Sequence, residues 1–345
     1  MGRRAVFAAG GAAVLTVAGL GVGRLLSGGR SVLPPSAQPA PSHASGQAAA
    51  APTAPATVPP TKIGGGPVVG IRGKALLGAY LELSGLTLKQ AFALRRKQLG
   101  RDLRIVHVFY DWTDQLPAGA IAGAPASAIP MISWRGTYHQ GIRAGQFDAM
   151  IRANARRLAR DGRPKFLRWG WEMNGNWYAW SGPKNDDDPA GYVDCWRRIH
   201  QIFTDEGVDN VSWVWSVNWN SAPDTAGNQF PAYYPGDQYV DWVAISGYNL
   251  HKEAPATLYD ELYQRYAARK PMMISEVGSV EYGGSTKGDW VTEFAAYVES
   301  RPNIAAVCWF DTDSHRNGPE TWRIDTNAHS LAEYKVMANG YRFSG

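Results

Sequence analysis

Residues 166–182 read FLRWGWEMNGNWYAWSG. An apolar strand that ends in polar and aromatic residues is found here and again along much of the chain. The beginning of this stretch alternates as a buried β-strand does, and its end, rich in Asn and Gly, is typical of a loop. It predicts a strand over residues 165–172 that ends on one carboxyl group, Glu172, in a loop crowded with tryptophan.

Outward from this stretch, short apolar runs alternate with helical patterns along the chain. The predicted strands cover residues 76–82, 104–112, 129–134, 165–172, 211–218, 239–249, 271–279 and 304–313. The predicted helices cover residues 86–100, 145–162, 189–207, 258–270, 288–301 and 330–339. Eight strands, most of them followed by a helix, predict a (β/α)8 TIM barrel, in which both faces of each strand are buried and apolar. A doubly wound open sheet would alternate similarly, but no glycine-rich phosphate-binding sequence follows the first strand.

The first 70 residues are predicted to stand apart from the barrel, which we assign to residues 71–345. Residues 1–30 join a basic start, with the pair Arg3 and Arg4, to an uncharged apolar run. This layout is that of a signal peptide of the twin-arginine kind, or of an uncleaved membrane anchor. Residues 31–70, rich in Pro, Ala, Ser and Thr, predict a disordered linker. We therefore expect the barrel to be secreted or held at the cell surface.

The net charge of +5 does not describe the barrel. Residues 1–75 contain seven basic and no acidic residues, which leaves 28 basic and 30 acidic residues, a net charge of −2, in residues 76–345. The composition therefore gives no argument for nucleic-acid binding. Two cysteines, Cys195 and Cys308, form neither a disulfide framework nor a metal-ligand cluster. Buried free thiols are favoured, and one disulfide stays open as the alternative.

Polar and aromatic residues gather at one end of nearly every predicted strand. The active sites of TIM barrels lie at the carboxyl ends of the strands. Glu172 ends the fourth strand and Glu276 lies in the seventh, on opposite sides of an eight-stranded barrel. Two carboxyl groups facing each other across the mouth have the arrangement that glycosidases use for the proton donor and the nucleophile. Aromatic faces also stack on the C–H faces of sugars.

The same residues also fit a purely structural role. Glu172 could simply pair with Arg168 while the tryptophans fill the core, because structural ion pairs also hold buried carboxylates. The concentration of polar residues at one end of the strands argues against this alternative. Asp311 and Asp313 are predicted either to contact sugar hydroxyls or to pair with nearby arginines. Of the two tryptophans that share a face of the fifth strand, Trp215 is predicted to lie nearer the mouth and Trp213 in the core.

Two motifs resemble glycoside hydrolase family 26. RWGWEMNGNWYAW, residues 168–180, is similar to the acid/base motif of that family, and ISEVGS, residues 274–279, is similar to its nucleophile motif. The resemblance covers roughly residues 76–340 and implies a retaining (β/α)8 glycosidase, most often an endo-β-1,4-mannanase and in some members a β-1,3-1,4-glucanase. It implies no metal and no organic cofactor, and a polysaccharide as the partner of a monomeric enzyme.

The resemblance also assigns roles to individual residues. Glu172 corresponds to the general acid/base and Glu276 to the nucleophile. The substrate-binding positions that it implies, with Trp215 and Asp311 added from their places at strand ends, are Arg168, Trp171, Asn174, Trp177, Tyr248, Trp309, Trp215 and Asp311. Tyr248 corresponds to a tyrosine that bonds the nucleophile and Trp309 to the aromatic floor of the subsite for the cleaved sugar. Trp171 departs from the family, which commonly has a histidine at this position. The motifs therefore predict the type of reaction more firmly than the identity of the sugar.

Two rival functions remain open from the residues alone. A non-catalytic glycan-binding barrel would use the same aromatic residues, but it would need neither Glu172 nor Glu276. An aldolase or a metal hydrolase on the same fold would need a lysine at a strand end or a cluster of histidines, and neither pattern occurs.

Overall fold

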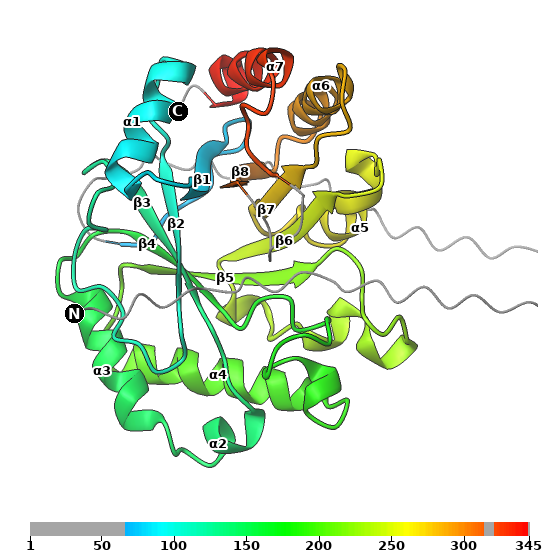
Figure 1. The fold of residues 1–345 in the computed structure, drawn as a ribbon. Helices are drawn as coiled ribbons and strands as arrows, with labels where there is room; N and C mark the ends of the chain where they lie inside the picture. The colour runs from blue at the N-terminus through cyan, green and yellow to red at the C-terminus, as the bar shows by residue number, and fades with distance from the viewer. Residues whose placement is uncertain (1–65, 314–320, 344–345) are drawn as a thin grey trace, which may run out of the picture. The chain divides into compact units, whose positions relative to one another are not determined.

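The computed structural model describes residues 66–313 and 321–343, and these form a closed barrel (Figure 1). The predictions of a signal peptide or anchor over residues 1–30, and of a linker over most of residues 31–70, lie outside the described residues. In the described residues, none of the helices is long and apolar enough to span a membrane.

Eight strands run in the order in which they occur in the chain, all parallel, with β8 paired to β1. They are β1 (Leu76–Glu82), β2 (Ile105–Tyr110), β3 (Ile129–Trp134), β4 (Lys165–Trp169), β5 (Val211–Asn218), β6 (Trp242–Asn249), β7 (Met272–Ser279) and β8 (Ile304–Thr312). This confirms the predicted TIM barrel. Strand β4 ends three residues earlier than predicted, at Trp169, because Gly170 adopts a left-handed backbone conformation with φ of 52°.

Helices follow most of the strands and surround the barrel (Figure 1). They are α1 (Leu88–Leu99), α2 (His139–Arg143), α3 (Asp148–Ala159), α4 (Pro189–Asp205), α5 (Pro255–Tyr266), α6 (Thr286–Glu299) and α7 (Ala328–Asn339). Helix α1 begins with a capping box between Thr87 and Gln90 and ends at Gly100, so its limits follow from local sequence. The sequence patterns did not predict the five-residue helix α2.

Alternation along each strand divides the side chains between two cores. Residues such as Phe166, Val214 and Met273 pack together in the barrel interior. Their neighbours, such as Leu167, Trp213 and Trp215, face outward and pack against the helices. Because both faces are buried, the apolar pattern of the sequence cannot reveal which face a given residue joins.

One irregularity changes this alternation in β7. Ile245 of β6 pairs with Ile274 but the next residue, Ser246, pairs with Glu276, so Ser275 is an extra residue. Such a bulge re-aims the side chains that follow it. Met273 faces inward and Ile274 outward, and the hydroxyl of Ser275 contacts Ser216 inside the barrel. The bulge therefore lets Glu276 face inward as well.

The chain entering the barrel closes its amino-terminal end. Val68 is buried among the interior residues, its backbone exchanges hydrogen bonds with the Ser212 hydroxyl, and its carbonyl accepts one from the Trp242 indole at 2.9 Å. The linker prediction was therefore wrong for residues 67–70, where Val68 seals the barrel. Both cysteines are buried and unpaired, which confirms the prediction of free thiols.

Candidate active site

Glu276 is held from two sides in the barrel interior. Arg168 Nη1 donates to its Oε1 at 2.6 Å, and the Tyr248 hydroxyl donates to its Oε2. Strands β4 and β7 are not neighbours in the barrel, so the contact between Arg168 and Glu276 crosses its interior. With both oxygens bonded, the carboxylate has one fixed orientation.

Arg168 organises several strands at once. Besides Glu276, its Nη1 donates to Ser133 Oγ on β3 at 3.2 Å, and its Nη2 donates to Ser246 Oγ on β6 at 2.7 Å. The guanidinium is buried, and its carbon lies 5.1 Å from the centroid of the Trp171 ring. A charge buried this deeply is stable only when it is paired and hydrogen-bonded, and the site provides both.

Glu172 lies just beyond the end of β4, in a turn with an unusual backbone. Its φ is 56°, a left-handed value that costs a non-glycine residue of order 1 kcal/mol. The turn is retained by hydrogen bonds from Glu172 N to Ser216 O and from Gly175 N to Glu172 O, each 2.9 Å long. Strained residues of this kind concentrate at functional sites, where the surrounding structure imposes the conformation.

The Glu172 side chain is bonded and yet poorly solvated. The Trp177 indole donates to its Oε2 at 2.9 Å. Burial, and then the charge of Glu276, together raise the pKa of Glu172 from its ordinary value near 4.5 to about 7, against the opposing effect of Arg168. Glu172 and Glu276 are 3% and 5% exposed. Two buried carboxyl groups with different partners can therefore take different protonation states near neutral pH.

Aromatic rings surround the two carboxyl groups. Trp171 contacts Phe109 of β2, Tyr178 and Trp180, with ring centroids 5.1 to 5.4 Å away. Trp180 donates its indole hydrogen to Trp171 O, which fixes the loop that carries Glu172. Such rings lower the local polarity and offer flat apolar surfaces of the kind on which sugars stack.

The structure brings together the predicted residues Glu172, Glu276, Arg168, Trp177 and Tyr248. Trp171 adjoins them, over the Arg168 guanidinium. His107 of β2 bonds Ser133 Oγ at 2.7 Å beneath the site. Burial, and then the charge of Arg168, keep its pKa well below the ordinary value, so the imidazole is neutral.

The predictions for Trp215 and Trp309 as substrate-binding residues were wrong. Trp215 packs outward against Phe230, Tyr234 and Tyr266. Trp309 contacts three aromatic residues of α6 and α7, namely Trp290, Phe294 and Tyr334. Both tryptophans lie at outward positions of their strands, so they fill the layer between sheet and helices.

Asp311 and Asn174 were also assigned wrongly. Asp311 shares the outward parity of Trp309 and forms a buried ion pair with Arg95 of α1 at 2.6 Å. Asn174 is buried, and its amide donates to Asn218 O and Ser221 Oγ and accepts from Asn218 N. Its side chain fastens the β4 loop to the end of β5, and none of these hydrogen bonds goes to either carboxyl group.

Sequence patterns missed several residues of the site. Ser133 and Ser246 bond Arg168, and Phe310 and Trp322 form a small cluster that includes Tyr248. The two serines stand at strand ends, which was a usable signal. Phe310 could be found only once the outward orientation of its neighbour Trp309 was known, and Trp322 follows the last strand outside any regular pattern.

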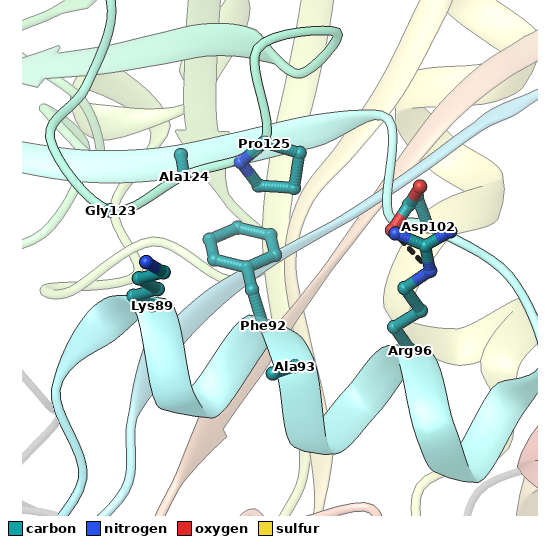
Figure 2. A pocket seen from close by; sticks show the side chains of 8 residues that line it. All are labelled: Lys89, Phe92, Ala93, Arg96, Asp102, Gly123, Ala124 and Pro125. Atoms are coloured by element: carbon teal, nitrogen blue, oxygen red, sulfur yellow. Dashed lines mark ion pairs between the residues drawn. The ribbon is translucent and has the colours of Figure 1, made fainter.

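A separate cavity of about 450 Å³ lies beside α1 (Figure 2). Its lining comes from α1, Asp102 and the segment before β3, and consists of Lys89, Phe92, Ala93, Arg96, Asp102, Gly123, Ala124 and Pro125. It contains neither carboxyl group of the site. Among the described residues, no group of three or more His, Cys, Asp or Glu side chains could hold a metal ion. The expectation that the reaction needs no cofactor stays a prediction.

Fold and site together define a (β/α)8 barrel with two buried carboxyl groups at the carboxyl ends of β4 and β7. Residues 138–332, more than half of the chain, match the model for glycosyl hydrolase family 26. The chain belongs to this family, as the two sequence motifs predicted.

Two curated relatives and one solved structure describe this likeness further. The chain is 33% identical over 255 residues to endoglucanase H of Acetivibrio thermocellus, covering 68% of this chain and 27% of that protein. It is 32% identical over 160 residues to mannan endo-1,4-beta-mannosidase A and B of Caldalkalibacillus mannanilyticus, covering 44% of this chain and 29% of that protein. The matched region thus spans less than a third of either relative. The structure of Bacillus subtilis mannanase BCman has a TM-score of 0.53 at 24% identity, covers 76% of this chain and 85% of that one, and shares the fold.

Proposed function

We propose that this protein is a retaining endo-β-glycanase that hydrolyses β-1,4-linked mannan by double displacement. The observation that carries the proposal is the contrast between the two carboxyl groups. Glu276 is oriented by Arg168 and Tyr248 on its two oxygens, whereas Glu172 is buried with a pKa of about 7. A nucleophile and a proton donor need this division of roles.

In the first step, a Glu276 oxygen attacks the anomeric carbon of the sugar and forms a glycosyl ester. The bond to the leaving oxygen breaks with its electron pair, and that oxygen takes the proton of Glu172. In the second step, Glu172 removes a proton from water, whose oxygen attacks the same carbon and releases Glu276 as a carboxylate. Two inversions give net retention of configuration.

The surrounding residues support these two roles. The Tyr248 phenol stays protonated, because burial and then the charge of Glu276 raise its pKa well above the ordinary value, so it can donate to the nucleophile throughout. The Trp177 indole bonds Glu172 and fixes the direction in which that proton is delivered. Arg168 counters the accumulation of negative charge when both carboxyl groups are ionised.

The choice of mannan rests on family membership and on the mannanase among the curated relatives. A β-glucan is the second candidate, on the observation that Trp171 stands where the family commonly has a histidine. An indole can donate one hydrogen bond and accept none, whereas an imidazole can do both. The hydrogen bonds to the sugar nearest the cleavage point therefore differ from those in family members with a histidine.

The decisive experiment gives the purified protein galactomannan, glucomannan and barley-type β-glucan and follows reducing ends and product sizes. We expect internal cleavage of the mannans, with products that NMR shows to form as the β-anomer. Preferential cleavage of the barley glucan would move the assignment to the second candidate. Binding to these polysaccharides without hydrolysis would identify a non-catalytic glycan-binding barrel and contradict the proposal.

We further propose that the enzyme acts as a monomer outside the cytoplasm. The support is the signal-like layout of residues 1–30 and the polymeric substrate, which is too large to enter a cell intact. Fractionation of cells that express the full chain, followed by light scattering of the released protein, tests both parts.

A further inference from the structure

The residues that follow β8 bring a tryptophan against the partner of the nucleophile. The centroids of the Trp322 and Tyr248 rings lie 4.9 Å apart. Trp322 also packs on the backbone of β7, because a Cβ added at Gly278 would come within 2.7 Å of Trp322 Cε3. Trp322 is buried, and Tyr248 in turn donates to Glu276. Only one side chain therefore separates Trp322 from the nucleophile.

The backbone around Trp322 is held at three consecutive carbonyls. The buried ammonium of Lys287 on α6 donates to Thr321 O at 3.5 Å and to Arg323 O at 2.5 Å. The Trp309 indole donates to Trp322 O at 2.7 Å. In the other direction, Trp322 N donates to Thr312 O at 3.0 Å, which ties the segment to the end of β8.

Charged side chains hold the next residues of the same segment. Arg95 of α1 bridges Asp311 and Asp325 at 2.6 Å and 2.8 Å, and Asp311 also accepts from Ile324 N at 3.3 Å. Arg323 pairs with Asp325 at 2.7 Å. Buried ion pairs contribute little net stability, but they fix a geometry, because breaking one leaves an unpaired buried charge.

From these contacts we infer that the segment Thr321–Asp325 is a positioning element for the nucleophile, with Trp322 pressing Tyr248 onto Glu276 and Lys287 holding Trp322 in place. The inference rests on the proposed function, since it concerns the nucleophile of that reaction. It assigns a role to a segment that lies outside both family motifs, and it explains why Lys287 is buried at a loop that contains no carboxyl group of the site.

The inference makes a specific kinetic expectation for Trp322→Ala. Tyr248 would lose its support, and a misplaced catalytic hydrogen bond costs about 10- to 100-fold in rate. The loss should fall on kcat rather than KM, and the acidic limb of the pH profile of kcat/KM should move to higher pH, as in Tyr248→Phe. If the two residues act together, the double variant Tyr248→Phe/Trp322→Ala is no worse than Tyr248→Phe alone.

Two further variants keep the test valid if Trp322→Ala folds poorly. Lys287→Met removes the donor to two carbonyls and should lower kcat less strongly in the same direction, while Lys287→Arg restores a cation and part of the activity. Trp215→Ala is the matched control, because it removes an equally buried tryptophan that packs outward, and it should leave the kcat of the folded protein and the pH profile unchanged.

A readout that does not need activity separates this inference from the proposed function. In protein labelled with ¹³C at the tyrosine ζ-carbon, the Tyr248 signal is assigned by its absence in Tyr248→Phe. Trp322→Ala and Lys287→Met should shift that signal, whereas Trp215→Ala should not. An unchanged Tyr248 signal, or additive losses in the double variant, would overturn the inference. Wild-type protein that cleaves no glycan would instead overturn the proposed function, and the NMR result would still decide the positioning role.

Discussion

The inward and outward positions at the carboxyl ends of the strands differ in kind. Arg168 and Glu276 face inward and hold each other at 2.6 Å across the barrel, whereas the rings of Trp215 and Trp309 face outward and pack in the layer of helices. All four stand near strand ends. The end of a strand thus locates a site, but the direction of the side chain decides whether a residue belongs to it.

Among the inward-facing residues, substitution of Glu276 should cause the largest loss of activity. Replacing it with Ala removes the proposed nucleophile, and we expect kcat to fall on the order of 10⁴-fold or more while the fold is kept. Kinetics on a mannan and circular dichroism check the two parts. Near-normal turnover by this variant would show that the inward position does not mark the catalytic residue.

Glu172→Ala should be the next most severe change, with a different signature. Loss of general acid catalysis costs about 10²- to 10⁴-fold. Aryl glycosides with good leaving groups need no proton donor, so their cleavage should suffer least, and added azide should rescue turnover by forming a β-glycosyl azide. Absence of rescue, together with equal losses on all leaving groups, would count against the acid/base role.

Substitution of an outward-facing tryptophan should lower the free energy of unfolding and leave kcat unchanged. Trp215→Ala leaves a cavity against Phe230 and Tyr266, which we expect to cost about 3–5 kcal/mol of unfolding free energy. Urea denaturation measures the cost, and kcat per folded molecule should equal that of wild type. Trp215→Phe, which keeps most of the volume, is the control and should lose much less. A selective loss of kcat at full stability would break the distinction between the two faces.

The high pKa of Glu172 predicts that the site destabilises the fold. In the folded protein its pKa is about 7, above the ordinary value near 4.5, so the folded state holds a proton that the unfolded state has released between these two pH values. The contribution of this proton to the free energy of unfolding is fully present below pH 4.5 and is lost as the pH rises to 7, a change of roughly 3 kcal/mol. Glu172→Gln should therefore raise Tm relative to wild type at pH 8 and not at pH 4. Glu276→Gln, which leaves Arg168 without its charged partner, should show no such gain.

The smallest expected effect concerns the hydrogen bond from Trp177 to Glu172. This bond lowers the pKa of Glu172, so Trp177→Phe should raise it and move the alkaline limb of the rate profile upward by about half a pH unit to one unit. Trp180→Phe is a suitable control, since the Trp180 indole donates to the Trp171 carbonyl instead of a carboxyl group. A limb that moves equally in both variants would mean that loop packing, and not the bond, sets the pKa.

The parts of the site that were predictable are those that local sequence controls. Glu172 follows a strand and precedes a Trp-rich loop, and Glu276 stands in an apolar run of strand length, so both could be placed at the mouth by counting strands. Counting strands could not distinguish Trp309 and Asp311, which face outward, from Phe310, which lies between them in the sequence. A strand buried on both faces has no apolar alternation that would show which neighbours point inward.

By itself, the sequence determined eight strands with helices between most of them, the limits of helices such as α1, and the two carboxyl groups at strand ends, because caps, periodicity and turn residues act over a few positions. Only the tertiary structure decided which side chains enter the site. The extra residue Ser275 lets Glu276 face inward, the left-handed turn at Gly170 and Glu172 brings the Glu172 carboxyl group within reach of Trp177, and Arg168 joins β4 to β7. These features depend on register and on partners that closure of the barrel brings together, which a single stretch of chain does not encode.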